Sequence, residues 1–290
     1  MARALILALL LLLTGCTVPA LQAEPSAPPP TETALETVPE TTLETLPETT
    51  APELPDLLTQ AEAMSARYGI DILIGEDAAA TEPWDYYFVP ETDPFLLKGK
   101  LSYLESCLSV YPEGMLKVLS QDYGGLHVCV VREIRGRKST GSLDSANGLQ
   151  FFSDENENYI VLAEDMEYTL FHELCHVIED FLLPRTPAWD DWESLNPADF
   201  SYDLDFTENA DRDGEAYLED DTRAFVDTYS MSFPREDRAR VMEYAMTPGN
   251  EDLFRPPIMQ SKLQMLCSGI REVFSIPDST SLLWEQYLTK

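Results

Sequence analysis

The sequence predicts an α+β fold, in which a small mixed or antiparallel sheet packs on one amphipathic helix and a mainly helical C-terminal half follows. Helical and strand patterns alternate over residues 57–134, which is typical of a mixed fold. Two apolar runs within residues 149–162 indicate an antiparallel hairpin directly before the helix. Residues 166–183 then carry one apolar stripe at helical period.

An export signal is predicted at residues 1–15, where a positive charge precedes an apolar run too short to span a bilayer. The run ends in a leucine, a small residue, a glycine and Cys16, an order that resembles the bacterial lipobox. The resemblance implies that Cys16 is diacylated and becomes the mature N-terminus. We therefore expect an extracytoplasmic lipoprotein, anchored to the bacterial cell membrane through its N-terminal lipid. An ordinary secretory signal with an incidental cysteine is the alternative.

Residues 16–56 are predicted to form a disordered acidic tether. The segment consists mainly of Pro, Thr, Ala and Glu and has no aromatic residue. A glutamate recurs at every fourth position from Glu32 to Glu48, but Pro39 and Pro47 interrupt the helix that this period would favour. Ordering the segment would cost entropy without burying apolar surface. It would reach about 100 Å when extended and span about 35 Å as a flexible coil.

The remaining residues, 57–290, are predicted to form one domain, because no Pro/Gly-rich break divides them convincingly. Gly69 stops the first helical pattern and an alternating, β-branched run follows it. The first half is expected to contain a helix at 57–68, a strand at 70–74, one or two helices at 95–121 with a break near 112–114, and a strand at 128–134.

Apolar positions within these elements indicate which side faces the core. The hairpin is expected from strands at 149–152 and 159–162, which flank six polar residues. Six residues of the preceding helices are expected to point inward: Leu96, Leu101, Leu104, Leu108, Met115 and Leu119.

The amino-acid composition limits which binding partners and which cysteine cross-links are expected. The formal net charge is −33, from 19 Lys and Arg against 52 Asp and Glu. Nucleic acid is therefore not an expected partner, because phosphate contacts need the cationic side chains that are scarce here. We interpret the acidity mainly as a property that keeps the protein soluble. The alternative interpretation is a preference for basic peptides. We expect the protein to be a monomer. Four cysteines beyond Cys16 lack metal-knuckle spacing and are expected to be buried free thiols: Cys107, Cys129, Cys175 and Cys267.

Metal-ligand chemistry is predicted at the HExxH box that runs from His172 to His176 in the amphipathic helix. Histidines four apart on a helix lie about 5–6 Å apart at Cβ, so both imidazoles can bind one Zn2+ ion. Glu173 can point past the ion and take a proton from a water that attacks a carbonyl. Glu179 or Asp180 could orient an imidazole. Two ordinary histidines on an amphipathic helix are the alternative.

Spacing alone does not choose a third metal ligand. The metzincin class of zinc peptidases has the pattern HExxHxxGxxH. This chain has other residues at the positions of the glycine and of the last histidine, so it does not fit that class. His127 lies upstream at the edge of an expected strand and is interpreted as structural. A carboxylate from a later helix is the natural alternative, and four are available: Glu193, Glu215, Glu219 and Glu236.

Residues 227–239 are similar to a segment of anthrax-lethal-factor-like zinc peptidases and of related bacterial lipoprotein metallopeptidases. In these proteins a Tyr precedes a helix that starts with an acidic pair. The resemblance implies that Tyr229 faces the reacting carbonyl and that Glu236 is the third zinc ligand. Pro234 suits the first turn of the helix that would present this glutamate. Arg240 departs from the pattern, because the family often has a second acid at this position.

The resemblance implies a zincin-like fold and a gluzincin-type zinc metallopeptidase that acts on a peptide or protein substrate. A non-catalytic zinc-binding lipoprotein that serves as a binding module is one alternative, and a zinc amidase acting on cell-wall components is another. Residues 186–214 are interpreted as a long loop that forms part of the substrate cleft or a lid. Its residues Trp189 and Trp192 serve either as subsites or as anchors to the core.

Overall fold

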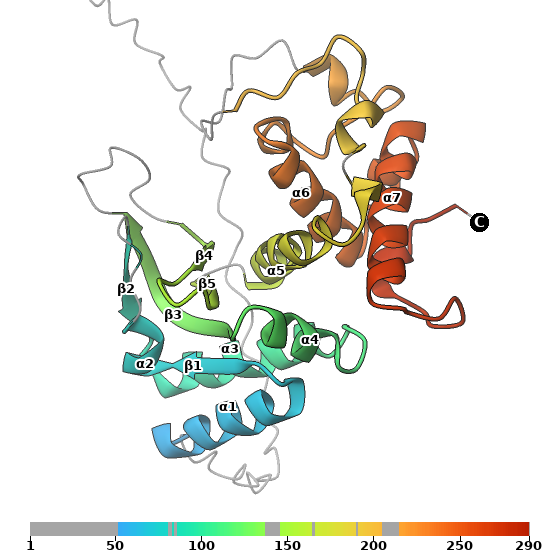
Figure 1. Cartoon of the computed structure of the whole chain (residues 1–290). Coiled ribbons are helices and arrows are strands. Elements are labelled where there is room, and N and C mark those ends of the chain that lie inside the picture. The colour runs from blue at the N-terminus through green and yellow to red at the C-terminus, as the bar shows by residue number, and fades with distance from the viewer. Residues whose placement is uncertain are drawn as a thin grey trace, which may run out of the picture. The chain divides into compact units, whose positions relative to one another are not determined.

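In the computed structural model, a five-stranded mixed sheet forms the centre of the N-terminal half of the domain (Figure 1). Its strands are β1 (Asp71–Ile74), β2 (Tyr86–Pro90), β3 (Leu126–Gly136), β4 (Gly148–Phe152) and β5 (Asn158–Leu162). The order is β1-β3-β5-β4, and β2 pairs with β3 outside this path. β3 runs parallel to β1 and β5, whereas β2 and β4 run antiparallel to their partners.

Helices pack against the sheet and make up the C-terminal half (Figure 1). The α-helices are α1 (Leu54–Tyr68), α2 (Gly75–Ala79), α3 (Pro94–Leu108), α4 (Met115–Asp122), α5 (Met166–Leu182), α6 (Pro234–Met246) and α7 (Pro257–Val273). Short 3-10 turns are η1 (Pro187–Trp189), η2 (Trp192–Leu195), η3 (Glu215–Tyr217), η4 (Tyr229–Met231), η5 (Glu251–Phe254) and η6 (Leu283–Glu285). Helix α5 contacts β4 and β5 and also packs on α6 and α7, so it joins the two halves.

The centre of the sheet, at β3 and β5, is buried on both faces. On one face, alternate residues such as Val128, Val130 and Ile160 pack with α1, α3, α4 and α5 into the main core. On the other face, Cys129 and Val161 belong to a smaller cluster that includes residues of β2 and α2. Strand β5 is buried along its whole length, as expected for a strand that is covered on both sides.

The order of elements confirms the predicted α+β class, including the hairpin that β4 and β5 form before α5. The helical segment 95–121 breaks before α4 at Gly114, where the backbone has a φ of 81°. The prediction that Leu96 faces inward is wrong, because its side chain is 57% exposed. The buried stripe of α3 runs instead through Leu97 and Leu101. Neither β2 nor α2 was among the expected elements.

Two tryptophans attach the loop after α5 to the C-terminal helices. Trp189 and Trp192 are both fully buried. Nε1 of Trp189 donates to the carbonyl oxygen of Met265 at 3.2 Å, and Nε1 of Trp192 donates to Asp237 at 2.9 Å. The tryptophans are therefore anchors to the core and not subsites. Residues 205–214 of the same loop lie outside the described residues.

The N-terminal predictions fall on residues that the structure does not describe. The described residues are 52–80, 83, 86–136, 146–163, 166–189, 191–204 and 215–289, so the signal at 1–15, Cys16 and most of the tether lie outside them. Helix α1 starts at Leu54, within the stretch 16–56 that was expected to be tether, and a proline occupies its first turn. Among the helices of the described ranges, none is long and apolar enough to cross a membrane. The domain cysteines are free and buried, as predicted.

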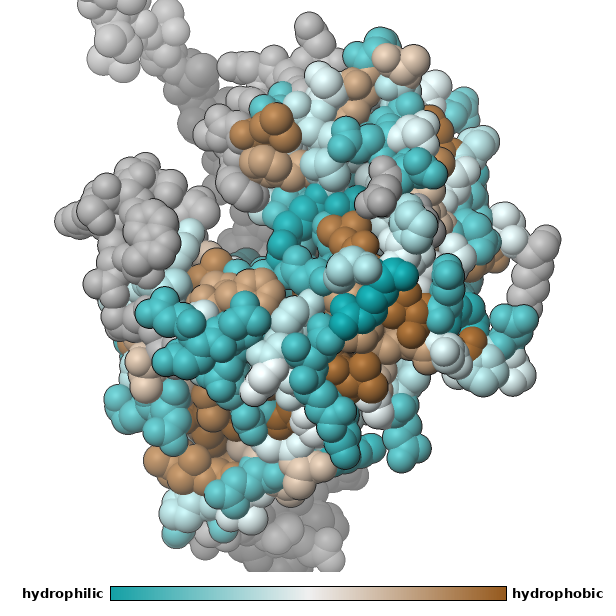
Figure 2. All heavy atoms as spheres, in the orientation of Figure 1, coloured by the Kyte–Doolittle hydropathy of each residue, from teal (hydrophilic) through white to brown (hydrophobic). Residues whose placement is uncertain are grey.

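The face of the molecule in Figure 2 is mainly hydrophilic, and hydrophobic residues form separate patches on it. Exposed apolar residues of this kind are normal on protein surfaces and mark no site by themselves. The hydrophilic surface agrees with the formal net charge of −33.

Candidate metal centre

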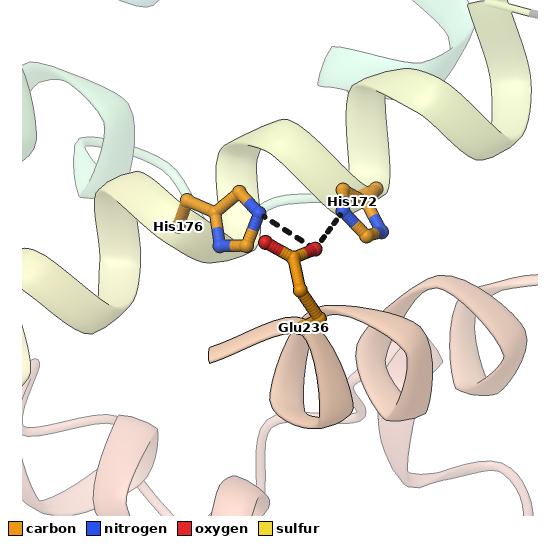
Figure 3. Close-up of side chains that lie close together, drawn as sticks. All are labelled: His172, His176 and Glu236. Carbon is orange, nitrogen blue, oxygen red and sulfur yellow. Dashed lines mark hydrogen bonds and ion pairs between the residues drawn. The ribbon is translucent and has the colours of Figure 1, made fainter. Parts of the chain in front are cut away.

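Helix α5 presents His172 and His176 toward α6 (Figure 3). The two residues are four positions apart, so they lie on successive turns, and their ring centroids are 4.8 Å apart. The apolar stripe of the helix, which includes Leu174 and Ile178, packs into the main core. Both imidazoles are buried. The structure therefore brings the two histidines of the box together, as the helical spacing predicts.

Glu236 meets the two histidines from α6 (Figure 3). Pro234 begins this helix, and Glu236 lies in its first turn. Oε2 of Glu236 is 3.0 Å from Nε2 of His172 and 3.5 Å from Nε2 of His176. The candidate ligand atoms of the three buried residues all lie within 4.8 Å of one another. The carboxylate that the family resemblance indicated is thus the one that reaches the box.

The donor atoms of this group fit a zinc ion. Two imidazole nitrogens and a carboxylate oxygen are ligands that zinc takes at about 2.0–2.2 Å. Around a tetrahedral ion with such bonds, neighbouring ligand atoms are about 3.3 Å apart. The two N···O distances, 3.0 and 3.5 Å, lie close to this value. Within the described ranges the group has three members, which leaves one tetrahedral position for water or substrate.

The same contacts shift the pKa values of the group. Burial on its own lowers the pKa of His172, but hydrogen bonds to Glu236 and Glu243 outweigh burial and raise the pKa to about 10. Burial alone would raise the pKa of Glu236, but the two histidines hold the pKa of this carboxyl well below its usual range. A proton is therefore held between carboxylate and imidazole, and a metal ion would replace it.

Glu243 holds the other ring nitrogen of His172. Nδ1 of His172 lies 3.0 Å from Oε2 of Glu243, which fixes the ring with Nε2 toward Glu236. Nη1 of Arg240 donates to both carboxylate oxygens of Glu243 at 2.9 Å. No sequence motif marks Glu243 for this role. Its position seven residues after Glu236 is the available signal, because two helical turns place both on one face of α6.

His176 is held by a cation instead. Nε of Arg235 donates to Nδ1 of His176 at 3.1 Å, and the guanidinium also pairs with Asp180 at 3.1 Å. Because a guanidinium only donates hydrogen bonds, Nδ1 of His176 is the acceptor in this contact, and Nε2 is the ring nitrogen that faces Glu236. Asp180, expected to orient an imidazole, therefore reaches His176 through Arg235. Glu179, the other expected residue, forms an ion pair with Arg238 at 2.5 Å.

A cavity of about 490 Å³ opens beside the His172 side of this group. Glu173 and Tyr229, the two residues predicted to be catalytic, both line it together with His172. Tyr229 lies in η4, just before α6, and its ring centroid is 6.2 Å from that of His172. The box glutamate and the tyrosine thus face one space beside the candidate ligands.

Burial shapes the proton chemistry of both residues. Burial raises the pKa of Glu173, against the lowering effect of the two neighbouring histidines. Burial, followed by the charges of Glu236 and Glu173, also raises the pKa of Tyr229. The phenol therefore keeps its proton at neutral pH and is a hydrogen-bond donor.

Strand β4 comes close to Glu173 at Gly148. A Cβ atom added at Gly148 would lie 2.0 Å from Cγ2 of Thr169 and 3.1 Å from Oε1 of Glu173. Any larger residue would therefore require the side chains of Thr169 and Glu173 to shift. The glycine lets strand β4 pass close to the box glutamate.

Asp237, the residue after Glu236, attaches the first turn of α6 to the core. Its Oδ2 accepts hydrogen bonds from Nζ of Lys262 at 2.6 Å, from the hydroxyl of Tyr202 at 2.7 Å and from Nε1 of Trp192 at 2.9 Å. The side chains of Asp237 and Lys262 are both 0% exposed. These contacts from α7 and the preceding loop fix where Glu236 lies.

The other carboxylates and the third histidine do not join the group. Glu193 and Glu219 are exposed and are not members of it. The side chain of Glu215 lies outside the described residues. His127, at the start of β3, pairs with Asp71 at 3.2 Å, which agrees with the structural interpretation.

The chain as a whole matches no family model, no curated protein and no solved structure. The site is therefore characterised by its geometry. A buried His172/His176/Glu236 group, with an HExxH box on a helix that packs on a mixed sheet, forms a possible metal site of the kind found in metal-dependent hydrolases.

Proposed function

We propose that this protein is a lipid-anchored, extracytoplasmic zinc-dependent peptidase of gluzincin type. The observation that carries the proposal is the convergence of His172, His176 and Glu236 within 4.8 Å, with Glu173 and Tyr229 lining the adjacent cavity. A purely structural zinc site usually has four protein ligands and has no use for the box glutamate. Three candidate ligands among the described residues, next to a cavity, favour catalysis over a binding module.

Each residue has a distinct role in this proposal. Zinc held by the three ligands would polarise the scissile carbonyl and lower the pKa of a water molecule. Glu173 takes the proton of the attacking water and passes it to the leaving nitrogen. Tyr229 donates a hydrogen bond to the carbonyl oxygen as negative charge develops on it. Glu243 keeps the ring of His172 in the orientation that directs Nε2 to the ligand group.

The test uses Glu173→Gln in the purified domain. The variant should retain one zinc ion per chain and lose peptide hydrolysis by at least about a hundredfold, because the amide cannot take up the proton. Zinc content is measured by atomic emission and hydrolysis by mass spectrometry of peptide digests. Glu251→Gln, at an exposed position in η5, is the matched control and should keep full activity. A wild-type protein without zinc, or an active Glu173→Gln variant, would refute the proposal.

A further inference from the structure

Arg240 presents an unused hydrogen-bond donor at the cavity. Its side chain lies on α6 and is 26% exposed. Nη1 donates to both oxygens of Glu243, and Nε lies 3.3 Å from Oδ2 of Asp227. Nη2 donates no hydrogen bond to the described part of the chain, and it is not among the buried unpaired atoms, so it is accessible. The residue lines the same cavity as Glu173 and Tyr229.

The charge of Arg240 is already balanced. Glu243 and Asp227 are two carboxylates against one guanidinium, and Glu173 adds a third acid to the cavity wall. Among the described residues that line the cavity, Arg240 is the single Lys or Arg. Nη2 can therefore donate a hydrogen bond, but there is no surplus of positive side-chain charge around it to hold a second anion. A neutral oxygen is a better partner for this donor than a carboxylate.

The position of the donor indicates which neutral oxygen it meets. The centre of the guanidinium is 5.0 Å from the ring centroid of Tyr229, so Arg240 lies against the residue that is proposed to face the scissile carbonyl. A peptide chain that places its scissile bond beside Glu173 and Tyr229 passes Arg240 with its next backbone groups. Backbone carbonyls are the neutral acceptors that every peptide offers at this distance from the bond.

We propose that Nη2 of Arg240 binds a backbone carbonyl oxygen of the substrate next to the scissile bond, and that the site therefore takes interior peptide bonds. It does not select a free C-terminal carboxylate. Arg240 is a substrate-binding residue, and the two hydrogen bonds of its Nη1 hold Glu243 on His172 at the same time. The inference rests on the proposed peptidase function and adds the substrate class to it.

The first test needs no variant. The wild-type zinc protein is incubated with a library of N-acetylated octapeptides that end in a C-terminal amide, and with the same peptides that end in a free carboxylate. Mass spectrometry should locate cleavage at interior bonds in both libraries, with kcat/KM values that agree within about threefold. Cleavage confined to the last one or two residues and lost on amidation, or cleavage seen only when the N-terminus of the same peptides is left free, would overturn the inference while leaving the peptidase function intact. No zinc-dependent cleavage in either library or of the peptides with a free N-terminus would contradict the peptidase function itself.

The second test uses Arg240→Lys, which keeps a cation beside Glu243 and removes the Nη2 donor. KM for an amidated peptide should rise about tenfold or more, with kcat changed much less, because a hydrogen bond from a charged donor is lost on substrate binding. Zinc content should remain one ion per chain. Arg255→Lys, an exposed arginine paired with Asp252, is the matched control and should change neither constant. An unchanged KM in Arg240→Lys would overturn the inference.

Discussion

His172 has a partner at each ring nitrogen, and only one of the two partners belongs to a recognisable motif. Glu236 faces Nε2, and Glu243 faces Nδ1 from two turns further along α6. A carboxylate on the outer nitrogen fixes the orientation of a metal-binding imidazole and makes it more basic. Arg240, which departs from the family pattern, supports this arrangement by holding Glu243. The acid at Nδ1 of His172 is thus Glu243, seven residues after the candidate ligand.

At this residue scale, we expect Glu243→Gln to weaken zinc binding by about tenfold or more. The amide keeps the shape of the side chain but loses the charge that stabilises the ring orientation of His172 and pairs with Arg240. Competition with a chelator of known affinity measures the change, and circular dichroism checks that the fold is retained. Glu251→Gln again provides the control. Wild-type affinity in a folded Glu243→Gln protein would show that Glu243 does not orient the histidine.

Among the elements, α6 decides whether the site exists. It carries Glu236, the third candidate ligand, and also Glu243 and Arg240, which hold the ring of His172 in place. Its first turn is attached to the core through Asp237, whose main charged partner is Lys262 of α7. Burial lowers the pKa of Lys262, and the charge of Asp237 and their hydrogen bond oppose this effect. A buried ion pair of this kind adds little net stability, because the cost of desolvating both charges offsets their attraction.

For this element we expect Lys262→Met to destabilise the domain by about 3–5 kcal/mol, because it leaves the charge of Asp237 buried without its partner. The double variant Lys262→Met with Asp237→Asn should lose less free energy of unfolding than Lys262→Met alone. Its asparagine is uncharged and still offers an oxygen to Trp192 and Tyr202. Urea denaturation of the single and double variants measures the coupling. Strictly additive losses would show that the two side chains do not act as a pair.

At the scale of the whole molecule, the proposed lipoprotein peptidase consists of a membrane anchor, a tether and a catalytic domain. The structure describes the domain from residue 52 onward, and the anchor at Cys16 rests on the sequence pattern. A lipid at Cys16 and an extended tether would hold the active site tens of ångströms from the bilayer surface. Substrates would then be peptides or proteins that reach the outer side of the membrane.

At this scale we expect Cys16→Ser to prevent lipid attachment when the full chain is expressed in bacteria. The wild-type protein should take up labelled fatty acid and sediment with membranes, whereas Cys16→Ser should lack the label. Thr17→Ser, beyond the lipobox, is the matched control and should behave as the wild type does. A fatty-acid label on the Cys16→Ser protein would contradict the assignment of Cys16.

Local patterns predicted the elements that have strong periodicity and failed where periodicity is weak. Helix α5 and the hairpin before it were predicted because apolar residues repeat clearly at helical and strand periods. Strand β2 was not predicted, because it has a single buried residue, Phe88, and ends in Pro90. Leu96 was assigned to the wrong side of α3, because its neighbour Leu97 is the residue of the first turn that reaches the core. These failures concern burial, which depends on neighbours from elsewhere in the chain.

The sequence by itself determined that His172, Glu173 and His176 share one helix and that a metal ion suits them, because side chains four apart on a helix meet without any help from the rest of the fold. Only the tertiary structure decided which distant carboxylate reaches them. Spacing left four glutamates open, and the packing of α6 against α5 selects Glu236 among the described side chains. The contacts of Glu243 with His172 and of Arg235 with His176 have the same origin. They join residues more than fifty positions apart, and no local period encodes such distances.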